Sequence, residues 1–274
     1  MRYIEQQLGR GGLHSGRQKD KKEAEENTHR VSLAGKGSRF GAGWIVEQQK
    51  SAALCPTLLN KLASSPVVIF ESQYNPPIAF FAELVGQDTL LLEAHDHYRK
   101  QTYRNRCLIL TAQGVKPLTV PVVDGNRSEK ISTAAIEIDY RQNWVHQHWR
   151  TLQTAYGGTP YFEYYADYLH DIYYQRPTLL FDLNTQLLRF YLRCLRLRLH
   201  VELTQEYLSS HPVTSDSALL DRRDWLTPKA AVADQPDRTS GPAYPQTFGV
   251  QFVPNLSILD LLFMQGPAAG AFLT

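Results

Sequence analysis

The densest group of side chains that could do chemistry lies in residues 95–106, which read HDHYRKQTYRNR. In an extended segment His95 and His97 face the same side, a spacing that suits two ligands of a metal ion. No third ligand stands nearby, so the pattern favours histidines that are hydrogen-bonded at the end of a strand. Because histidine titrates near neutral pH, either one is also a candidate general base.

Three cations stand in the same segment: Lys100, Arg104 and Arg106. Ammonium and guanidinium groups bind phosphates and carboxylates through charge-assisted hydrogen bonds. The segment therefore predicts a site for an anionic small molecule, such as a phosphate, a carboxylate or a nucleotide sugar.

A second group of polar and aromatic side chains lies in residues 143–165. On a helix Trp144 and His148 stand four residues apart and share a face. This spacing by itself indicates an aromatic core stripe with a buried, hydrogen-bonded histidine. The tyrosines at 161–168 are likewise more typical of packing than of a sugar-binding platform.

Several catalytic motifs do not occur in the chain. It has no G-x-S-x-G, no G-x-x-x-x-G-K-[ST], no H-E-x-x-H and no G-x-G-x-x-G after a strand. These motifs build the nucleophile elbow, the P-loop, a zinc site and the dinucleotide-binding turn. The common serine hydrolases, P-loop enzymes and dinucleotide oxidoreductases are therefore disfavoured.

The elements that must hold residues 95–106 are those of an α/β unit. Residues 67–70 and 89–93 are short apolar runs typical of buried strands, and residues 78–85 between them are helical in character. Strand, helix and strand in this order predict a parallel sheet. Ligands of such sheets bind beyond the carboxyl ends of the strands, which is where residues 95–106 stand.

The rest of the chain continues this pattern toward a helical C-terminal half. We predict strands at 107–111, 118–123, 135–138 and 197–203, helices at 139–156, 160–174, 178–196 and 258–263, and a long loop at 209–248. The predicted fold class is α/β, with a mixed, mainly parallel sheet and flanking helices.

Residues 1–65 differ in composition from the remainder. They carry 11 Lys/Arg against 6 Asp/Glu, whereas residues 66–274 carry 18 against 21. They hold 3 of the 30 aromatic residues, too little apolar surface to offset the entropy of ordering. We predict a disordered, dispensable extension before a single domain at 66–274, and a start at Val67 or Val68 would delete it. Its mixed charges do not favour a nucleic-acid-binding arm.

The setting of the protein is also indicated by what the sequence lacks. No apolar run reaches the roughly 18 residues of a membrane span. The cysteines Cys55, Cys107 and Cys194 lie far apart without a C-x-x-C motif, which indicates neither a disulfide framework nor a zinc knuckle. We therefore expect a cytoplasmic protein.

Five blocks in order along the chain resemble the WbqC-like family: ESQYNPPIAFF, HDHYRKQTYRNR, LTVPV, NWVHQHWRTLQTAYGGTPYFEYY and PNLSILDLLF. Members of this family are associated with bacterial surface-polysaccharide (O-antigen) gene clusters. The resemblance implies a transferase that acts on an activated or amino sugar, or on a similar anionic metabolite. Residues 1–65 have no counterpart in the family.

The resemblance also implies roles for individual residues. It raises His148 to a candidate proton acceptor beside His97. Substrate-binding roles are implied for seven residues that match the blocks: Gln73, Tyr74, Lys100, Tyr103, Asn105, Arg106 and Asn255. Of these, Lys100, Asn105 and Arg106 would hold the anion, and we expect no metal ion, no cofactor and no nucleic acid.

Two alternatives are weighed against this hypothesis. The turn after the first strand is similar to that of nucleotidyltransferases, but the following helix lacks their H-x-G-H motif, which disfavours adenylyl or cytidylyl transfer. The second alternative is a non-catalytic binding or assembly protein that docks a partner on its tyrosines and tryptophans. Divergence in space of His97, His148, Lys100 and Arg106, instead of a shared pocket, would favour that alternative.

Overall fold

The computed structural model describes residues 66–123, 131–208, 219–228 and 242–274. The predicted extension at 1–65 lies outside the described residues, as do two parts of the predicted loop, 209–218 and 229–241. In the part that the model describes, the fold is mixed α/β with a mainly parallel sheet and flanking helices, as the sequence predicted.

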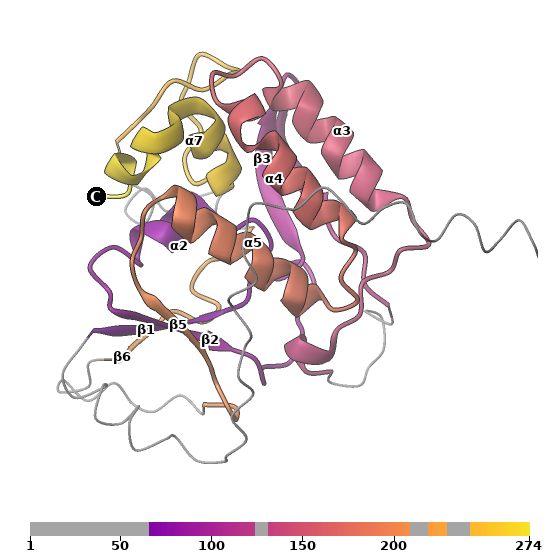
Figure 1. The fold of residues 1–274 in the computed structure, drawn as a ribbon, viewed down its shortest axis with the longest axis vertical. Helices are drawn as coiled ribbons and strands as arrows, with labels where there is room; N and C mark the ends of the chain where they lie inside the picture. The colour runs from indigo at the N-terminus through magenta and orange to yellow at the C-terminus, as the bar shows by residue number, and fades with distance from the viewer. Residues whose placement is uncertain (1–65, 124–130, 209–218, 229–241) are drawn as a thin grey trace, which may run out of the picture. The chain divides into compact units, whose positions relative to one another are not determined.

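Four parallel strands form the sheet that organises the fold (Figure 1). They are β1 (Val67–Glu71), β2 (Thr89–Glu93), β5 (His200–Leu203) and β6 (Leu219–Asp221), in the order β5-β2-β1-β6. β1 and β2 pair in register along their whole length. All ten of their residues are buried, as expected for strands in the middle of a parallel sheet.

Alternate side chains of the central strands enter two different apolar clusters. Val68, Phe70, Leu90 and Leu92 belong to the main core, which the helices complete. Val67, Ile69 and Leu91 point to the opposite face and form a small cluster of their own. This is the period-two alternation of a strand, with both faces apolar.

Helices α2 (Ile78–Ala82) and α5 (Leu180–Cys194) lie over the face of the sheet that carries the main core (Figure 1). α5 is amphipathic, with its leucines at 180, 183, 187 and 188 buried. α2 is capped at Glu83 and followed by hydrogen-bonded turns, which end at Gly86 with its positive φ of 79°.

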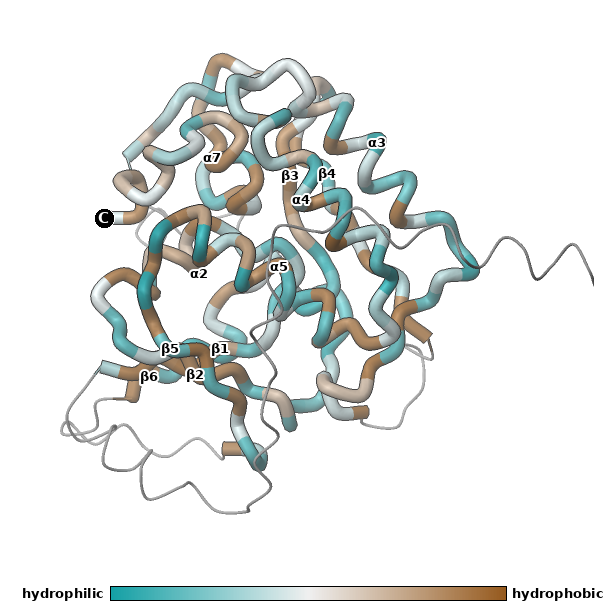
Figure 2. The backbone as a smooth tube through the Cα atoms, viewed as in Figure 1, coloured by the Kyte–Doolittle hydropathy of each residue, from teal (hydrophilic) through white to brown (hydrophobic). Residues whose placement is uncertain are grey.

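A second layer contains a hairpin and the remaining helices. The hairpin pairs β3 (Arg106–Thr111) with β4 (Gly114–Thr119), and the helices are α3 (Trp144–Tyr156), α4 (Phe162–Tyr174) and α7 (Ile258–Gln265). α4 contacts α3, α5 and α7, and α7 also contacts β3 and α2. Short 3-10 turns occur at Thr133–Ala135 (η1) and Gly266–Phe272 (η3). Figure 2 shows the hydrophobic central strands and the largely hydrophilic exposed side of α3.

Several bounds differ from those predicted: the helix predicted from 139 begins at Trp144, the strand predicted from 197 begins at His200, and the helix predicted to 85 ends at Ala82. Three further differences concern strands. The strand predicted at 118–123 begins earlier, at Gly114, because a φ of 97° there lets the chain fold back on β3. Residues 135–138 form no strand but two isolated bridges, Val122 to Ile138 and Glu137 to Leu179. β6 lies inside the predicted loop, because pairing with β1 orders three residues that carry almost no periodic signal.

Candidate functional site

Three strands of the sheet end in an acidic residue at the same edge. β1 ends at Glu71, β2 at Glu93 and β6 at Asp221. The chain runs from β1 to β2 on one side, whereas β6 pairs with β1 on the other side. The strand order therefore switches between β1 and β6, the position at which open α/β sheets bind their ligands.

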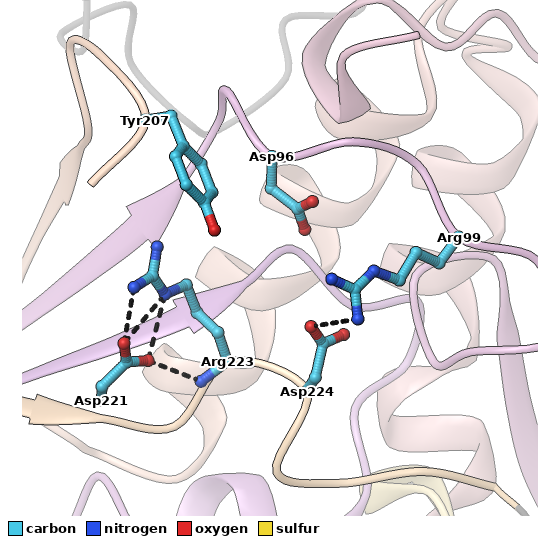
Figure 3. A pocket seen from close by; sticks show the side chains of 6 residues that line it. All are labelled: Asp96, Arg99, Tyr207, Asp221, Arg223 and Asp224. Atoms are coloured by element: carbon cyan, nitrogen blue, oxygen red, sulfur yellow. Dashed lines mark hydrogen bonds and ion pairs between the residues drawn. The ribbon is translucent and has the colours of Figure 1, made fainter. Parts of the chain in front are cut away.

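A pocket with a volume of about 210 Å³ lies at this edge. We call it the sheet-edge pocket, and it is lined by Asp96, Arg99, Tyr207, Asp221, Arg223 and Asp224. Figure 3 shows these side chains directed toward one space from three segments. The first two follow β2, Tyr207 follows β5, and the others lie at the end of β6 and just after it.

Arg104 forms the floor beneath two of the pocket acids. Its side chain is fully buried, and it is ion-paired through Nε and an Nη atom with Asp96 and through the other Nη, at 2.9 Å, with Asp224. Burial by itself would lower the pKa of Arg104, but the neighbouring carboxylates of Glu71, Asp96 and Asp224 raise it overall. The guanidinium therefore stays charged and holds both aspartates in place.

Glu71 holds the backbone of Asp224. Its carboxylate accepts hydrogen bonds from the Gln73 amide at 2.8 Å and from the Asp224 N–H at 2.9 Å. Burial raises the pKa of Glu71, although Arg104 and the backbone hydrogen bonds act in the opposite direction. Asp224 has a φ of 55°, a left-handed conformation that is uncommon for a residue with a side chain. Such conformations persist where the surroundings impose them, often at functional sites.

Arg223 closes the other side of the pocket. It donates from Nε and one Nη to Asp221, and from the other Nη to Glu93 at 3.0 Å and to the Leu208 carbonyl. Hydrogen bonding to Asp221 raises the pKa of Arg223. The Tyr207 ring lies 5.3 Å from the guanidinium carbon, a cation–π contact. All three guanidinium nitrogens of Arg223 are thus already occupied.

Arg99 differs from these two arginines in its exposure. Its side chain is 60% exposed, and one Nη lies 2.8 Å from the carboxylate of Asp224, itself 33% exposed. Exposed ion pairs of this kind contribute only about 0–1 kcal/mol, because water competes for both partners. Arg99 is therefore the cation of the sheet-edge pocket that is held most weakly.

None of the sequence-predicted site residues lines the sheet-edge pocket. His97 and Lys100 are exposed on the segment that also carries Asp96 and Arg99. The neighbouring His95, which the sequence paired with His97, hydrogen-bonds through its ring to the Thr204 carbonyl. The four residues whose divergence we set as a criterion, His97, His148, Lys100 and Arg106, do not share this pocket.

Four of the predicted substrate-binding residues carry buried polar atoms that have no hydrogen-bond partner among the described residues. These atoms are Gln73 Oε1, the Tyr103 hydroxyl, Asn105 Oδ1 and Arg106 Nε. Asn105 uses its amide nitrogen to bond the Val120 carbonyl, which anchors the β4 end of the hairpin. Buried polar atoms are nearly always paired in proteins, so such atoms point to ordered water or a ligand.

His148 and Tyr74 lie inside a network that also contains Asn75, Tyr173 and Tyr191, which we call the tyrosine network. The Tyr74 hydroxyl lies 2.9 Å from His148 Nδ1 and 3.3 Å from the Tyr173 hydroxyl. Burial lowers the pKa of His148 to about 4, although a hydrogen bond to the Thr119 backbone opposes this. The imidazole is therefore neutral at physiological pH, and its hydrogen-bond partners are the Tyr74 hydroxyl and the Thr119 backbone.

Asn75 is the centre of the tyrosine network. Its amide nitrogen donates to the Tyr173 hydroxyl at 2.8 Å, and its amide oxygen accepts from the Tyr191 hydroxyl at 2.6 Å. Asn255, another predicted substrate-binding residue, accepts a hydrogen bond from the Ala79 N–H at 3.1 Å and so fixes the first turn of α2. Tyr74, His148 and Asn255 are therefore buried residues whose hydrogen bonds join elements of the fold to one another.

Sequence reasoning missed most of the sheet-edge pocket for an identifiable reason. Asp96 and Arg99 do lie in the segment that it singled out, but Asp221, Arg223 and Asp224 fall in the predicted loop. A signal was present, since the run LLDRRD places two apolar residues directly before four charged ones. This pattern is typical of a short buried strand that ends at a polar site.

Two further findings concern metal ions and membranes. Among the residues that the structure describes, no three His, Cys, Asp or Glu side chains are grouped so that they could hold a metal ion. Of the helices in those same residues, none has the length and apolar character needed to cross a bilayer.

Comparison with known proteins identifies one family. The model of the WbqC-like protein family matches residues 71–271. The chain is also 30% identical, over 230 residues, to the uncharacterized protein Rv1507c of Mycobacterium tuberculosis, covering 76% of this chain and 96% of that protein. No solved structure matches the chain.

Proposed function

The chain belongs to the WbqC-like protein family, and we propose that it is a transferase that binds an activated or amino sugar in the sheet-edge pocket. The observation that carries this proposal is the set of carboxylates and guanidinium groups at the switch point of a parallel sheet. In this proposal the protein acts in the cytoplasm, in the synthesis of surface polysaccharide.

The size of the pocket supports a single sugar ring as the part that is enclosed. Drug-sized ligands occupy pockets of about 300–1,000 Å³, and the sheet-edge pocket, at about 210 Å³, is smaller. A whole nucleotide sugar would therefore extend out of it, with the nucleotide outside and the sugar inside.

The chemistry of the lining supports the same orientation. The carboxylates of Asp96, Asp221 and Asp224 can accept hydrogen bonds from sugar hydroxyls, and the Tyr207 ring offers an aromatic face. Arg99, exposed and weakly paired, suits the anionic group that joins sugar and nucleotide. Lys100, the next residue in the chain, is also exposed and adds a second positive charge to this segment.

The residues predicted from the sequence take a supporting part in this proposal. Gln73 fixes Glu71, and the unpaired atoms of Tyr103, Asn105 and Arg106 would bind ordered water or a second portion of the substrate. The role of proton acceptor, which the sequence suggested for His97 or His148, fits the pocket carboxylates better. His148 is buried in the tyrosine network, away from the pocket lining.

Thermal unfolding in the presence of nucleotide sugars tests the proposal. A ligand present at one hundred times its Kd stabilises the folded state by about 2.7 kcal/mol. We expect one member of a panel of uridine, guanosine, thymidine and cytidine diphosphate sugars to do so, and Asp96→Asn to abolish the shift. If no member of the panel stabilises the protein, or if the variant responds like the wild type, the proposal is wrong.

A second candidate function rests on the exposed tyrosines of α4. Tyr164 is 66% exposed and Tyr168 is 47% exposed, and both lie on one helix. Because His97, His148, Lys100 and Arg106 are also absent from the lining of the sheet-edge pocket, these tyrosines favour a non-catalytic binding or assembly protein. Under that function, Tyr164→Ser with Tyr168→Ser would abolish capture of a partner from cell extract, and no nucleotide sugar would bind.

A further inference from the structure

Asp224 is held by two arginines that differ sharply in strength. Arg104 reaches it from below with a side chain that has no exposure to solvent, at 2.9 Å. Arg99 reaches it from the rim at 2.8 Å, with 60% of its side chain exposed. The Arg104 guanidinium is shielded from water, so its ion pair with Asp224 is not readily replaced. Water competes for the exposed Arg99 guanidinium, which weakens its ion pair with the same carboxylate.

The other nitrogen donors around the pocket are committed. Each guanidinium nitrogen of Arg104 and of Arg223 donates to a carboxylate or a carbonyl. Among the described residues, Arg99 is seen to pair through one nitrogen alone. An anion that arrives at the sheet-edge pocket therefore finds its guanidinium donor at Arg99.

Asp224 would stay in place if Arg99 turned away. Its backbone N–H is bound by Glu71 and its other carboxylate oxygen by Arg104. The residue is thus fixed from two sides that do not involve Arg99. Departure of Arg99 would uncover one carboxylate oxygen on the pocket side without moving the aspartate.

From this geometry we infer an ion-pair exchange: the diphosphate group of the substrate takes Arg99 from Asp224, and the carboxylate oxygen so released binds the sugar hydroxyls in the pocket. The inference rests on the proposed function, since it assumes an activated sugar as the ligand. The exchange assigns the diphosphate to Arg99. It also explains why binding of the diphosphate would favour binding of the sugar. By linkage, occupation of one part strengthens binding of the other.

Titration calorimetry with inorganic pyrophosphate tests the exchange without any need for turnover. We expect the wild type to bind pyrophosphate and Arg99→Ala to bind it at least about tenfold more weakly, since charge-assisted hydrogen bonds are lost. Asp224→Asn should bind it several-fold more tightly, because the carboxylate that competes for Arg99 is gone. Asparagine tolerates the left-handed backbone at this position and still accepts from Arg104.

Asp221→Asn is the matched control, because Asp221 lines the same pocket but pairs with Arg223. It should leave the affinity for pyrophosphate within about twofold of the wild type, apart from the general effect of one charge. Tighter binding by Asp224→Asn alone supports the exchange. Equal gains in both variants mean that the effect is only net charge, and the inference then fails.

A second measurement serves if Asp224→Asn does not fold. In the wild type, nitrogen-15 spectra of the arginine side chains should show the Arg99 Nε signal shifting on addition of pyrophosphate while the Arg104 signal stays. No shift at Arg99, or no binding of pyrophosphate, overturns the exchange. If a nucleotide sugar nevertheless stabilises the protein, the proposed function stands and the exchange alone is wrong.

Discussion

The sheet-edge pocket and the tyrosine network both bring polar groups together, but they differ in their exposure to solvent. In the tyrosine network, Tyr74, Asn75, Tyr173 and Tyr191 are fully or almost fully buried, and their polar atoms bond one another. In the sheet-edge pocket a buried arginine holds acids that still reach the surface, and a second, exposed arginine shares one of them. A closed network contributes specificity and stability to a fold, whereas an open one retains capacity to bind.

The largest effect should follow from removal of the buried cation. Arg104→Met leaves Asp96, Asp224 and Glu71 without their common partner, and breaking a buried ion pair in this way costs about 3–5 kcal/mol. Urea unfolding measures the loss. Arg99→Met removes the exposed partner of the same aspartate and should cost no more than about 1 kcal/mol. Similar losses of unfolding free energy in both variants would show that the buried and the exposed ion pair contribute equally to stability.

The next effect is a dependence of stability on pH that comes from the tyrosine network. Burial lowers the pKa of His148 to about 4 in the folded state, from an ordinary value of 6.5. Between these values the unfolded state binds the proton and the folded state does not, so stability is lost as the pH falls from about 6.5 toward 4. The loss attributable to this residue approaches about 3 kcal/mol.

Comparison with His148→Gln isolates this contribution from that of the carboxyl groups. The variant should be less stable than the wild type at pH 7, and its unfolding free energy should fall less steeply between pH 6.5 and 4. Parallel curves for the two proteins would mean that His148 does not stay neutral in the folded state.

A smaller effect should follow from loss of one hydroxyl in the tyrosine network. Tyr173→Phe removes the oxygen acceptor of the buried Asn75 amide and leaves it only the weak sulfur acceptor of Cys107 at 3.6 Å, which costs about 1–3 kcal/mol. Tyr164→Phe removes a hydroxyl from the same helix at a position that is 66% exposed, and it should be neutral. Thermal unfolding of the pair gives the difference, and a neutral Tyr173→Phe would refute the bonded network.

The smallest effect on stability should come from the rim of the sheet-edge pocket. Tyr207 is 55% exposed, so Tyr207→Ala should change the unfolding free energy by no more than about 0.5 kcal/mol. The same change removes the aromatic face of the pocket and should weaken binding of a nucleotide sugar about tenfold, as measured by calorimetry. A large loss of stability with unchanged affinity would show that Tyr207 serves the stability of the fold and does not bind ligand.

Local pattern was sufficient for much of the fold. The apolar runs of β1 and β2 and the leucine spacing of α5 predicted those elements directly, because each is specified by neighbours in the sequence. β6 was missed, since a strand of three residues exists only through its pairing with β1. The predicted strand at 135–138 was wrong because its alternation is satisfied there by a 3-10 turn and two bridges.

The same division holds for the candidate site. Residue types in 95–106 were enough to locate one wall of the sheet-edge pocket, and the family was evident from the order of the blocks. The other wall depends on Asp224, which meets Arg104 across 120 positions of sequence. Likewise His148 stands on a helix whose spacing indicates its shared face with Trp144, but its partner Tyr74 is 74 positions away. Types and periods are properties of a segment, whereas charge pairing and burial are set by which segments the sheet brings together.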